Sequence, residues 1–478
     1  MSRIVVVGIA IVLILLPLPA GSHRFDAERL FAALVALLAL LAVADTGGAM
    51  RLDRTQRCTV LLWLLWLLWL AVQWLPLPAE WLQRFAPASY EAYARVAAAG
   101  GSPVWRISLS PLDTQWMLWL SLVYGVWYLL ILCVVRTPSA ARGILLCVIA
   151  SAVAQAVFGT AMVMSGLELN AFGHKTAYIG SATGTFVNRN HFAGYLEIGG
   201  ALATGLILAR FANAAREKRR LRLWFRDFIE ALLTRNLWLR LGLLVIVVGL
   251  VASRSRMGAL AFLTAVSVGS VLFLGFRGRG GRLRGLFFLI TVIVIDGVLV
   301  GGQFGLDELL QRFAYFRVIG DMRVTTFGDL YDMASHYATS GIGLGSFAYA
   351  YPQFRSASVY AFNDHAHNDY AEFLIETGIV GFAILASLVT LVCGRALAII
   401  AQRKDVHARG VALGGLLALG CIALHSLTDF NLQIPANAAT VVAILALIAG
   451  LSPRRRQSRT AAAPPGTESA QSTSPVPR

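Results

Sequence analysis

The chain has 478 residues, of which 57% are hydrophobic and only 14% are charged. Its mean hydropathy of +0.68 excludes an ordinary soluble domain, and many apolar stretches are long enough to cross a bilayer. The formal net charge of +16 would suit a nucleic-acid-binding protein, but in a membrane protein basic residues first report the orientation of the chain. We therefore predict an all-α, polytopic integral membrane protein.

Hydrophobic segments recur along the chain at lengths that suit membrane-spanning helices. They cover residues 4–20, 27–44, 58–75, 115–135, 143–164, 191–210, 237–253, 258–276, 286–302, 372–394, 410–427 and 438–451. Because segments of the same kind follow the first one, we interpret residues 4–20 as a retained helix rather than a signal peptide. We expect about twelve transmembrane helices.

The distribution of basic residues predicts which side each loop faces. If the N-terminus lies inside, about two thirds of the 41 Lys and Arg residues fall in the inner loops and the tail, as the positive-inside rule requires. The opposite orientation violates that rule. We expect both termini on the cytoplasmic side, membrane lipids as partners, and no nucleic-acid partner.

These segments divide the chain into four regions. Residues 1–302 should form the first nine transmembrane helices, 303–371 a large periplasmic loop, 372–451 the last three helices and 452–478 a disordered cytoplasmic tail. Helical spacing of apolar residues predicts short helices in the loop, at 306–316 and near 323–337. A second outer loop, 76–114, is amphipathic and should lie along the membrane surface. Its aromatic residues are Trp81, Phe85, Tyr90 and Tyr93.

A junction between polar loop and hydrophobic helix follows the large loop. Asp369 with Glu372 three residues later is typical of an N-cap and its capping-box partner, so the helix should begin near Tyr370. His367 and Asn368 would then lie at the helix mouth, where free N–H groups and the helix dipole favour an anion. His367 could act there as a base near neutral pH, or it could simply cap and solvate the junction.

Several glycines lie in the same part of the chain. The run Gly341-Ile-Gly-Leu-Gly-Ser346 is similar to a phosphate-binding loop, but it lacks the preceding strand and the Lys-Ser/Thr pair. We therefore expect a tight turn there. Gly378 and Gly381 lie about one turn apart, which should let a neighbouring helix pack closely.

Several basic residues lie near membrane ends on the outer side, where the orientation rule does not require them. They are Arg189, Arg254, Arg256, Arg312 and Arg323. Each of these arginines could, on its own, simply extend its side chain so that the charged end reaches the lipid headgroups. Several arginines converging with a histidine would instead form an anion site, since guanidinium groups bind phosphate oxygens bidentately.

These motifs together resemble the O-antigen ligase and polymerase superfamily of bacterial membrane proteins. His367-Asn368, nine residues and then Gly378-Ile-Val-Gly381 are similar to its His-Asn-x9-Gly-x-x-Gly signature. Further similar stretches are Thr185–Gly194, Ser255-Arg-Met-Gly258, and Arg323 followed by Gly341–Phe347. The chain departs from the family at Tyr337-Ala338, where a His-Pro pair is usual before the glycine turn.

The resemblance implies a GT-C-like fold in the bacterial inner membrane and a glycosyltransferase reaction at the periplasmic face. The donor would be a polyprenyl-diphosphate-linked glycan, and the acceptor a hydroxyl of a glycan or of the lipid A-core. His367 would be the catalytic base, and Arg189, Arg256 and Arg323 would bind the diphosphate. Secondary candidates are Arg254, Arg312, Asn188, Asn190, His191, Asn368 and Glu376. No cofactor and no metal are expected, because the donor is already activated and arginine can replace a divalent cation.

Alternatives remain open at individual residues. His365 and His367, with Asp364 and Asp369 nearby, could hold zinc. His191 could be a second acid or base, or only an interfacial polar contact. Glu197 lies two helical turns beyond Asn190 and could line the same cavity. Asp296, inside a hydrophobic segment, could be a buried anchor or part of a conduction path.

Several functions also remain open. A ligase, a repeat-unit or exopolysaccharide polymerase and a protein O-glycan transferase share these motifs. A lipid-glycan transporter is the rival from another class, but it should carry charges near the bilayer midplane in two related halves. The sequence leaves the glycan, the acceptor and the oligomeric state undetermined.

Overall fold

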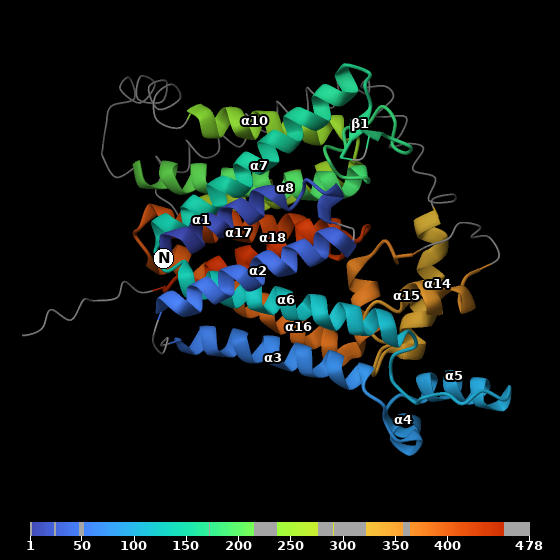
Figure 1. Ribbon diagram of the computed structural model, residues 1–478. Helices are drawn as coiled ribbons and strands as arrows, with labels where there is room; N and C mark the ends of the chain where they lie inside the picture. The colour runs from blue at the N-terminus through green and yellow to red at the C-terminus, as the bar shows by residue number, and fades with distance from the viewer. Residues whose placement is uncertain are drawn as a thin grey trace, which may run out of the picture.

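The computed structural model describes residues 2–22, 25–46, 52–171, 173–214, 237–275, 290, 322–356 and 364–453. Within these ranges the chain is helical apart from turns, links and one two-stranded hairpin. The long helices run side by side as one bundle, with the N-terminus at one end (Figure 1).

In the described part of the chain, eight helices are long and apolar enough to cross a membrane. They lie within α2 (Phe25–Thr46), α3 (Arg54–Trp74), α6 (Pro111–Val134), α7 (Pro138–Met164), α8 (Arg189–Ala214), α11 (Arg256–Gly275), α16 (Asp369–Gln402) and α17 (Val406–His425). Three shorter apolar helices accompany them, namely α1 (Ser2–Leu15), α10 (Leu237–Ala252) and α18 (Pro435–Gly450). The prediction of an all-α multi-pass membrane protein is confirmed. The count of twelve stays a prediction, because the segment expected at 286–302 lies outside the described residues except for Ile290.

Local sequence signals account for several helix starts. Asp53 caps α3, where its side chain accepts from the N–H of Gln56 at 3.0 Å while the Gln56 side chain accepts from the N–H of Asp53 at 3.0 Å. Thr137 caps α7 and precedes a proline at its first turn. Asp405 caps α17 by accepting from the N–H of Ala408 at 2.8 Å.

Helix α8 lies at the centre of the bundle, and its spanning stretch is entirely buried. It packs against α7, α10, α11 and α17. Gly205 of α8 faces the backbone of Gly414 in α17 so closely that a Cβ atom on Gly205 would overlap it. Small residues thus bring these two helix axes together, as they commonly do in membrane proteins.

The short elements gather at the end of the bundle opposite the N-terminus (Figure 1). They are α4 (Ala79–Phe85), α5 (Pro87–Ala98), β1 (Leu169–Asn170), β2 (Gly173–His174), α14 (Met322–Tyr337) and α15 (Phe347–Ala350). The strands pair antiparallel, with Leu169 opposite His174. The helix expected near 323–337 is confirmed as α14 and the amphipathic outer loop contains α4 and α5, whereas the hairpin was not expected. The helix expected at 306–316 lies outside the described residues.

Helix α16 is interrupted at Gly378, whose φ of 64° and ψ of −178° are not helical. The break leaves carbonyl groups without helical partners, and residues of the glycine run bind two of them. The N–H of Ile342 donates to Ile375 O at 3.1 Å, and the N–H of Gly343 donates to Glu376 O at 2.9 Å. The glycine run is therefore a tight turn, as predicted, and it closes against the broken helix.

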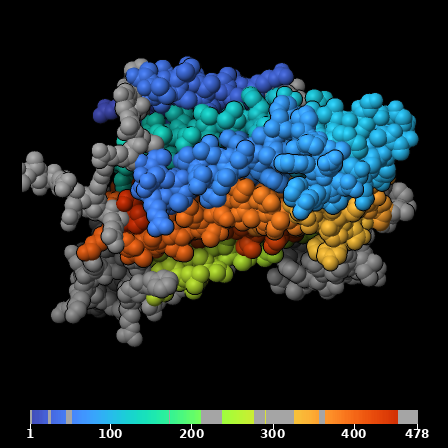
Figure 2. All heavy atoms as spheres, turned by 90° about the horizontal axis from the view of Figure 1, so that it is seen from below, coloured from blue at the N-terminus to red at the C-terminus, as the bar shows by residue number. Residues whose placement is uncertain are grey.

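Gly378 consequently has a different role from the one expected. It faces the Thr339–Gly341 backbone of that turn rather than a neighbouring helix. Gly381 does face a helix, because a Cβ atom there would lie 3.0 Å from the Trp69 ring of α3. Figure 2 shows α16 (orange) and α3 (blue) side by side along the bundle, with α14 (yellow) beside them at the end that carries the short elements.

Candidate functional site

The start of α16 is capped one residue earlier than the sequence suggested. Asn368 is the N-cap, and its side chain accepts from the N–H of Ala371 at 3.0 Å. Asp369, the expected cap, is instead a buried residue of the first turn and accepts from the hydroxyl of Ser426 at 2.6 Å. Both residue types cap helices well, so tertiary contacts decide between them.

Glu372 is likewise not a capping-box partner. Its Oε2 atom accepts from the N–H of Ala366 at 2.8 Å, and its Oε1 atom pairs with Nδ1 of His365 at 2.7 Å. Although burial opposes protonation, the charge and hydrogen bond of Glu372 raise the pKa of His365 to about 9. His365 is therefore a cation at neutral pH that anchors the residues before α16.

His367 follows in a left-handed backbone conformation with a φ of 50°. Such a conformation costs energy for a residue with a side chain, and it persists only where surrounding contacts hold it. The His367 side chain is 36% exposed, so it can reach a substrate. Its Nδ1 atom lies 3.7 Å from Oδ1 of Asp429, which is an ion-pair distance rather than a hydrogen bond.

Asp429 is the carboxylate on which the site is built. It lies in the link between α17 and α18, and its side chain is 1% exposed. Asn190 donates to its Oδ2 atom at 2.6 Å, and Nε2 of His191 lies 3.7 Å from its Oδ1 atom. Burial favours the neutral acid, but the neighbouring imidazoles of His191 and His367 hold the pKa of Asp429 well below its usual range.

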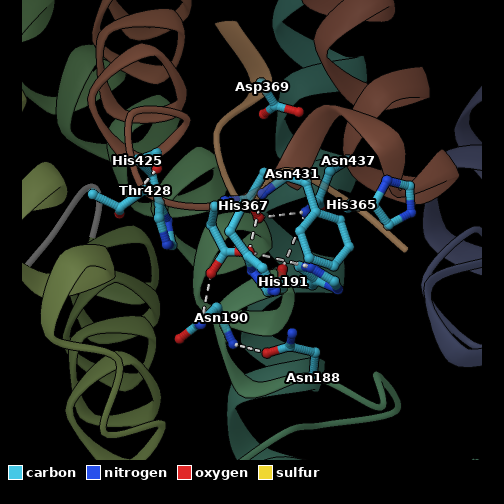
Figure 3. Close-up of polar contacts among 12 residues, drawn as sticks. Asn188, Asn190, His191, His365, His367, Asp369, His425, Thr428, Asn431 and Asn437 are labelled. Carbon is cyan, nitrogen blue, oxygen red and sulfur yellow. Dashed lines mark hydrogen bonds and ion pairs between the residues drawn. The ribbon is translucent and has the colours of Figure 1, made fainter. Parts of the chain in front are cut away.

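Three imidazole rings surround the ring of Phe430. His365 stacks on it with centroids 4.3 Å apart, while His191 and His367 contact it edge-on at 4.5 Å and 4.9 Å. Figure 3 shows His191 of α8 meeting His365 and His367, from the segment before α16, above Asn190. The aromatic residue thus fixes the relative positions of the three rings.

The 425–431 link was missed by the sequence reasoning. It supplies His425, Asp429, Phe430 and Asn431, all of which are buried. Asn431 accepts from the side chain of Asn437 at 3.2 Å and packs where a Cβ atom on Gly194 would overlap it. A signal was present, since a histidine stands near the end of one apolar segment, and an acid and an amide stand between it and the next segment.

Arg189 lies next to these residues, at the first position of α8. Its guanidinium lies 5.6 Å from the centre of the Tyr178 ring, and Nη1 is 3.4 Å from the hydroxyl of Ser181. Asn188 accepts from the N–H of Asn190 at 2.8 Å and so shapes the start of the helix. The structure therefore brings Asn190, His191 and His367 together around Asp429, whereas the Arg189 guanidinium contacts Tyr178 and Ser181.

The structure connects the other candidate arginines less directly to the site around His367. Arg254 has a φ of 55°, is exposed, and lies beside Gly180 of the 165–188 loop. Arg256 is exposed at the start of α11, and among the described residues no contact joins it to His367. Arg323 begins α14, but its side chain, like all of Arg312 and Asp296, lies outside the described residues.

Glu376 and the proposed zinc ligands have other partners. Glu376 is buried and accepts from the N–H of Phe347 at 2.9 Å, so it holds the start of α15. His365 is paired with Glu372, and Asp369 with Ser426. In the part of the chain that the structure describes, no three His, Cys, Asp or Glu residues are grouped to hold a metal ion.

Chemically, the site combines a partly exposed imidazole with a buried carboxylate beside it, and the Arg189 guanidinium lies at the start of α8, one residue before Asn190. Such an arrangement can accept a proton from a hydroxyl and stabilise the resulting imidazolium, while the guanidinium binds an anion.

Comparison with known proteins found one family similar to part of this chain. Residues 241–386 match the model of the O-antigen ligase family. No curated protein matches the chain. The matched segment includes Arg256 and His367, while Arg189 and Asp429 lie outside it. This match confirms the resemblance that the motifs indicated: residues 241–386 of this multi-pass membrane protein are similar to the O-antigen ligase family.

Proposed function

We propose that the protein is a metal-independent membrane glycosyltransferase that moves a polyprenyl-diphosphate-linked glycan to an acceptor hydroxyl. The observation that carries the proposal is His367, which is partly exposed, held in a left-handed conformation, and placed 3.7 Å from the buried carboxylate of Asp429. The family match supports glycan transfer in general.

The acceptor oxygen attacks the anomeric carbon of the donor glycan, and the bond from that carbon to the diphosphate oxygen breaks. His367 takes the proton of the acceptor hydroxyl as the new glycosidic bond forms. The Asp429 carboxylate stabilises the imidazolium and orients the ring, so that the other ring nitrogen faces the acceptor. The proton then passes to water or to the released polyprenyl diphosphate.

The leaving diphosphate gains negative charge, which fixed cations can stabilise in a partly dry site. Arg189 is the best-supported partner because it adjoins Asn190, which bonds directly to Asp429. Arg256 and Arg323 are the further candidates, and Arg254 and Arg312 are secondary ones. Because the donor is already activated, the reaction needs neither ATP nor another cofactor.

We place the site at the periplasmic face of the bacterial inner membrane, with both termini in the cytoplasm. Two features support this orientation. The basic residues assigned to the inner side include Arg136, in the link from α6 to α7, and Arg142, near the start of α7. Helix α6 begins beside the glycine turn at the site end, so this link lies at the other end of the bundle. The N-terminus lies at the end of the bundle opposite the short elements that surround the site (Figure 1).

The acceptor distinguishes the possible reactions. A lipid A-core acceptor makes the protein an O-antigen ligase, and a second lipid-linked repeat unit makes it a polymerase of O-antigen or exopolysaccharide. A protein hydroxyl makes it a protein O-glycan transferase. Transport of a lipid-linked glycan is disfavoured because Glu197, an acid of the spanning part, is paired with a histidine and buried.

Deletion of the chromosomal gene, followed by analysis of surface and lipid-linked glycans, tests the proposal. Loss of capped lipopolysaccharide with intact long lipid-linked chains indicates a ligase, and accumulation of single repeat units indicates a polymerase. Complementation with wild-type protein should restore the glycan, and His367→Ala should not. An unchanged glycan profile in the deletion strain would contradict the proposal.

A further inference from the structure

Glycines allow α8 and α17 to approach each other closely. Gly205 faces Gly414, and Gly410 faces Leu206 and Ala209 of α8. Small side chains allow close packing, but they interdigitate little and so oppose axial sliding weakly. Some other contact must therefore set how far along its axis α17 lies against α8.

A buried polar pair crosses this interface. Oε1 of Glu197 in α8 lies 2.7 Å from Nδ1 of His425 in α17, and both side chains are 0% exposed. The glycosyl-transfer mechanism proposed above does not use either residue. Ionisable groups inside membrane helices are costly and are retained for a purpose. One well-supported purpose of a buried polar contact between helices is to specify their register.

This pair is connected to the site through the chain that follows it. His425 is the last residue of α17, and its carbonyl accepts from the N–H of Thr428 at 3.0 Å in the turn that leads to Asp429. Asn190 of α8, two helical turns before Glu197, bonds to Asp429 at 2.6 Å. Helix α8 therefore contacts the end of α17 and the link after it at two points: Glu197 pairs with His425, and Asn190 bonds to Asp429.

The start of α11 packs closely against the carboxylate of Glu197. A Cβ atom on Gly258 would lie 2.9 Å from Oε1 of Glu197 and 2.8 Å from Cβ of Ala193, so only glycine fits without rearrangement. Gly258 belongs to the Ser255-Arg-Met-Gly258 motif that carries Arg256. Glu197 thus lies where α8, α11 and α17 meet.

We propose that the Glu197–His425 pair sets the register of α17 against α8 and thereby places Asp429 beside His367. Both are positioning residues, because neither reaches the substrate. The effect on glycan transfer rests on the proposed function, whereas the effect on helix register does not.

Disulfide trapping measures the register directly. In a background without the five native cysteines, Ala209→Cys and Gly410→Cys together place two thiols across the interface. A Cβ atom on Gly410 lies 3.6 Å from Cβ of Ala209, within the range for a disulfide. This parent protein should crosslink rapidly under mild oxidation.

The test variant is Glu197→Leu with His425→Leu in that parent. Replacing both partners leaves no unpaired buried charge, so the protein should fold, but the directional contact is lost. Crosslinking should become several-fold slower. Thr204→Val is the matched control, since the Thr204 hydroxyl donates to Gly200 O at 2.8 Å within α8. Equal crosslinking rates for parent and double-leucine variant would overturn the register role.

Glycan transfer by the same proteins tests the positioning role. Without the 209–410 disulfide, the double-leucine variant should lose about 100-fold in kcat, with little change in the KM of the lipid-linked donor. Oxidation to the 209–410 disulfide should restore most of this kcat, because the lock replaces the lost register. Glu197→Gln, which can still pair with His425, should remain close to the parent. A locked double-leucine variant as slow as the unlocked one would exclude the positioning role.

If the parent itself transfers no glycan, the proposed function fails. The crosslinking rates then still decide whether Glu197 and His425 set the register.

Discussion

Oδ1 of Asp429 lies 3.7 Å from Nδ1 of His367, although 62 residues separate them in the chain. The aspartate is buried in the link between α17 and α18, and the histidine is partly exposed before α16. In the proposed mechanism, this carboxylate holds the His367 ring in place and stabilises the positive charge that forms when the ring takes a proton from the acceptor.

The first prediction concerns that carboxylate. Asp429→Asn keeps the shape of the side chain but removes its charge, so kcat for glycan transfer should fall by about 100-fold or more, as in other histidine–carboxylate pairs. The KM of the lipid-linked donor should change little. Asp332→Asn, at an exposed position of α14, is the matched control and should behave as wild type. A wild-type kcat for Asp429→Asn would show that the mechanism does not use this residue.

The second prediction compares two neighbouring arginines. Arg256→Lys should impair transfer, because a lysine keeps the charge but cannot bind phosphate oxygens bidentately. Arg254→Lys should have a smaller effect, since Arg254 lies beside Gly180 of the 165–188 loop. Donor KM and kcat of both purified variants provide the measurement. Equal activity of Arg256→Lys and wild type would rule out bidentate phosphate binding at Arg256.

The third prediction concerns pH. The pKa of His365 is raised to about 9, from an ordinary value of 6.5, by its pairing with Glu372. A raised histidine pKa means that the pair stabilises the fold fully below pH 6.5 and that this stabilisation is lost as the pH rises through 9. The difference in Tm between wild type and His365→Gln should therefore be largest near pH 6 and small near pH 10.

Glu372→Gln serves as the second arm of this experiment. It removes the carboxylate that raises the pKa of His365, and it should remove the same pH-dependent step in Tm. A difference between wild type and His365→Gln that stays constant from pH 6 to 10 would contradict the ion pair.

Much of the architecture could be predicted from the sequence because apolar segments of membrane length are unambiguous. Eleven of the expected segments coincide with described apolar helices. His367 could be found because it belongs to a motif at a helix start. The cap itself was assigned one residue too late, since Asn368 and Asp369 are both suitable caps and only the contact of Asp369 with Ser426 decides between them.

Local signals marked Asp429 only as an acid between two apolar segments and did not reveal its partners. It contributes through contacts with His367 and with Asn190, which lies 239 residues away in the chain. The role of Gly378 was also hidden, because its effect depends on the Thr339–Gly341 turn that it contacts. Contacts between distant segments leave no periodicity in either segment.

The fourth prediction concerns topology. In a background without native cysteines, Gln353→Cys, exposed at the site end, should react with an impermeant maleimide from the periplasmic side. Ser346→Cys is the buried control and should react slowly. Gln402→Cys, exposed at the far end of α16, should react only after the cytoplasmic side is opened. The reverse pattern for positions 353 and 402 would invert the orientation and remove the periplasmic site.

The central claim is that His367 is the base of a glycan transfer that needs only the lipid-linked donor and an acceptor. The most direct measurement is the rate at which purified protein in nanodiscs transfers a polyprenyl-diphosphate-linked glycan, without ATP and with EDTA present. His174→Ala, at an exposed position of the hairpin, is the matched control. Wild type and this control should form product, while folded His367→Ala should be slower by about 100-fold or more. A well-folded His367→Ala protein with a near-normal rate would contradict the account.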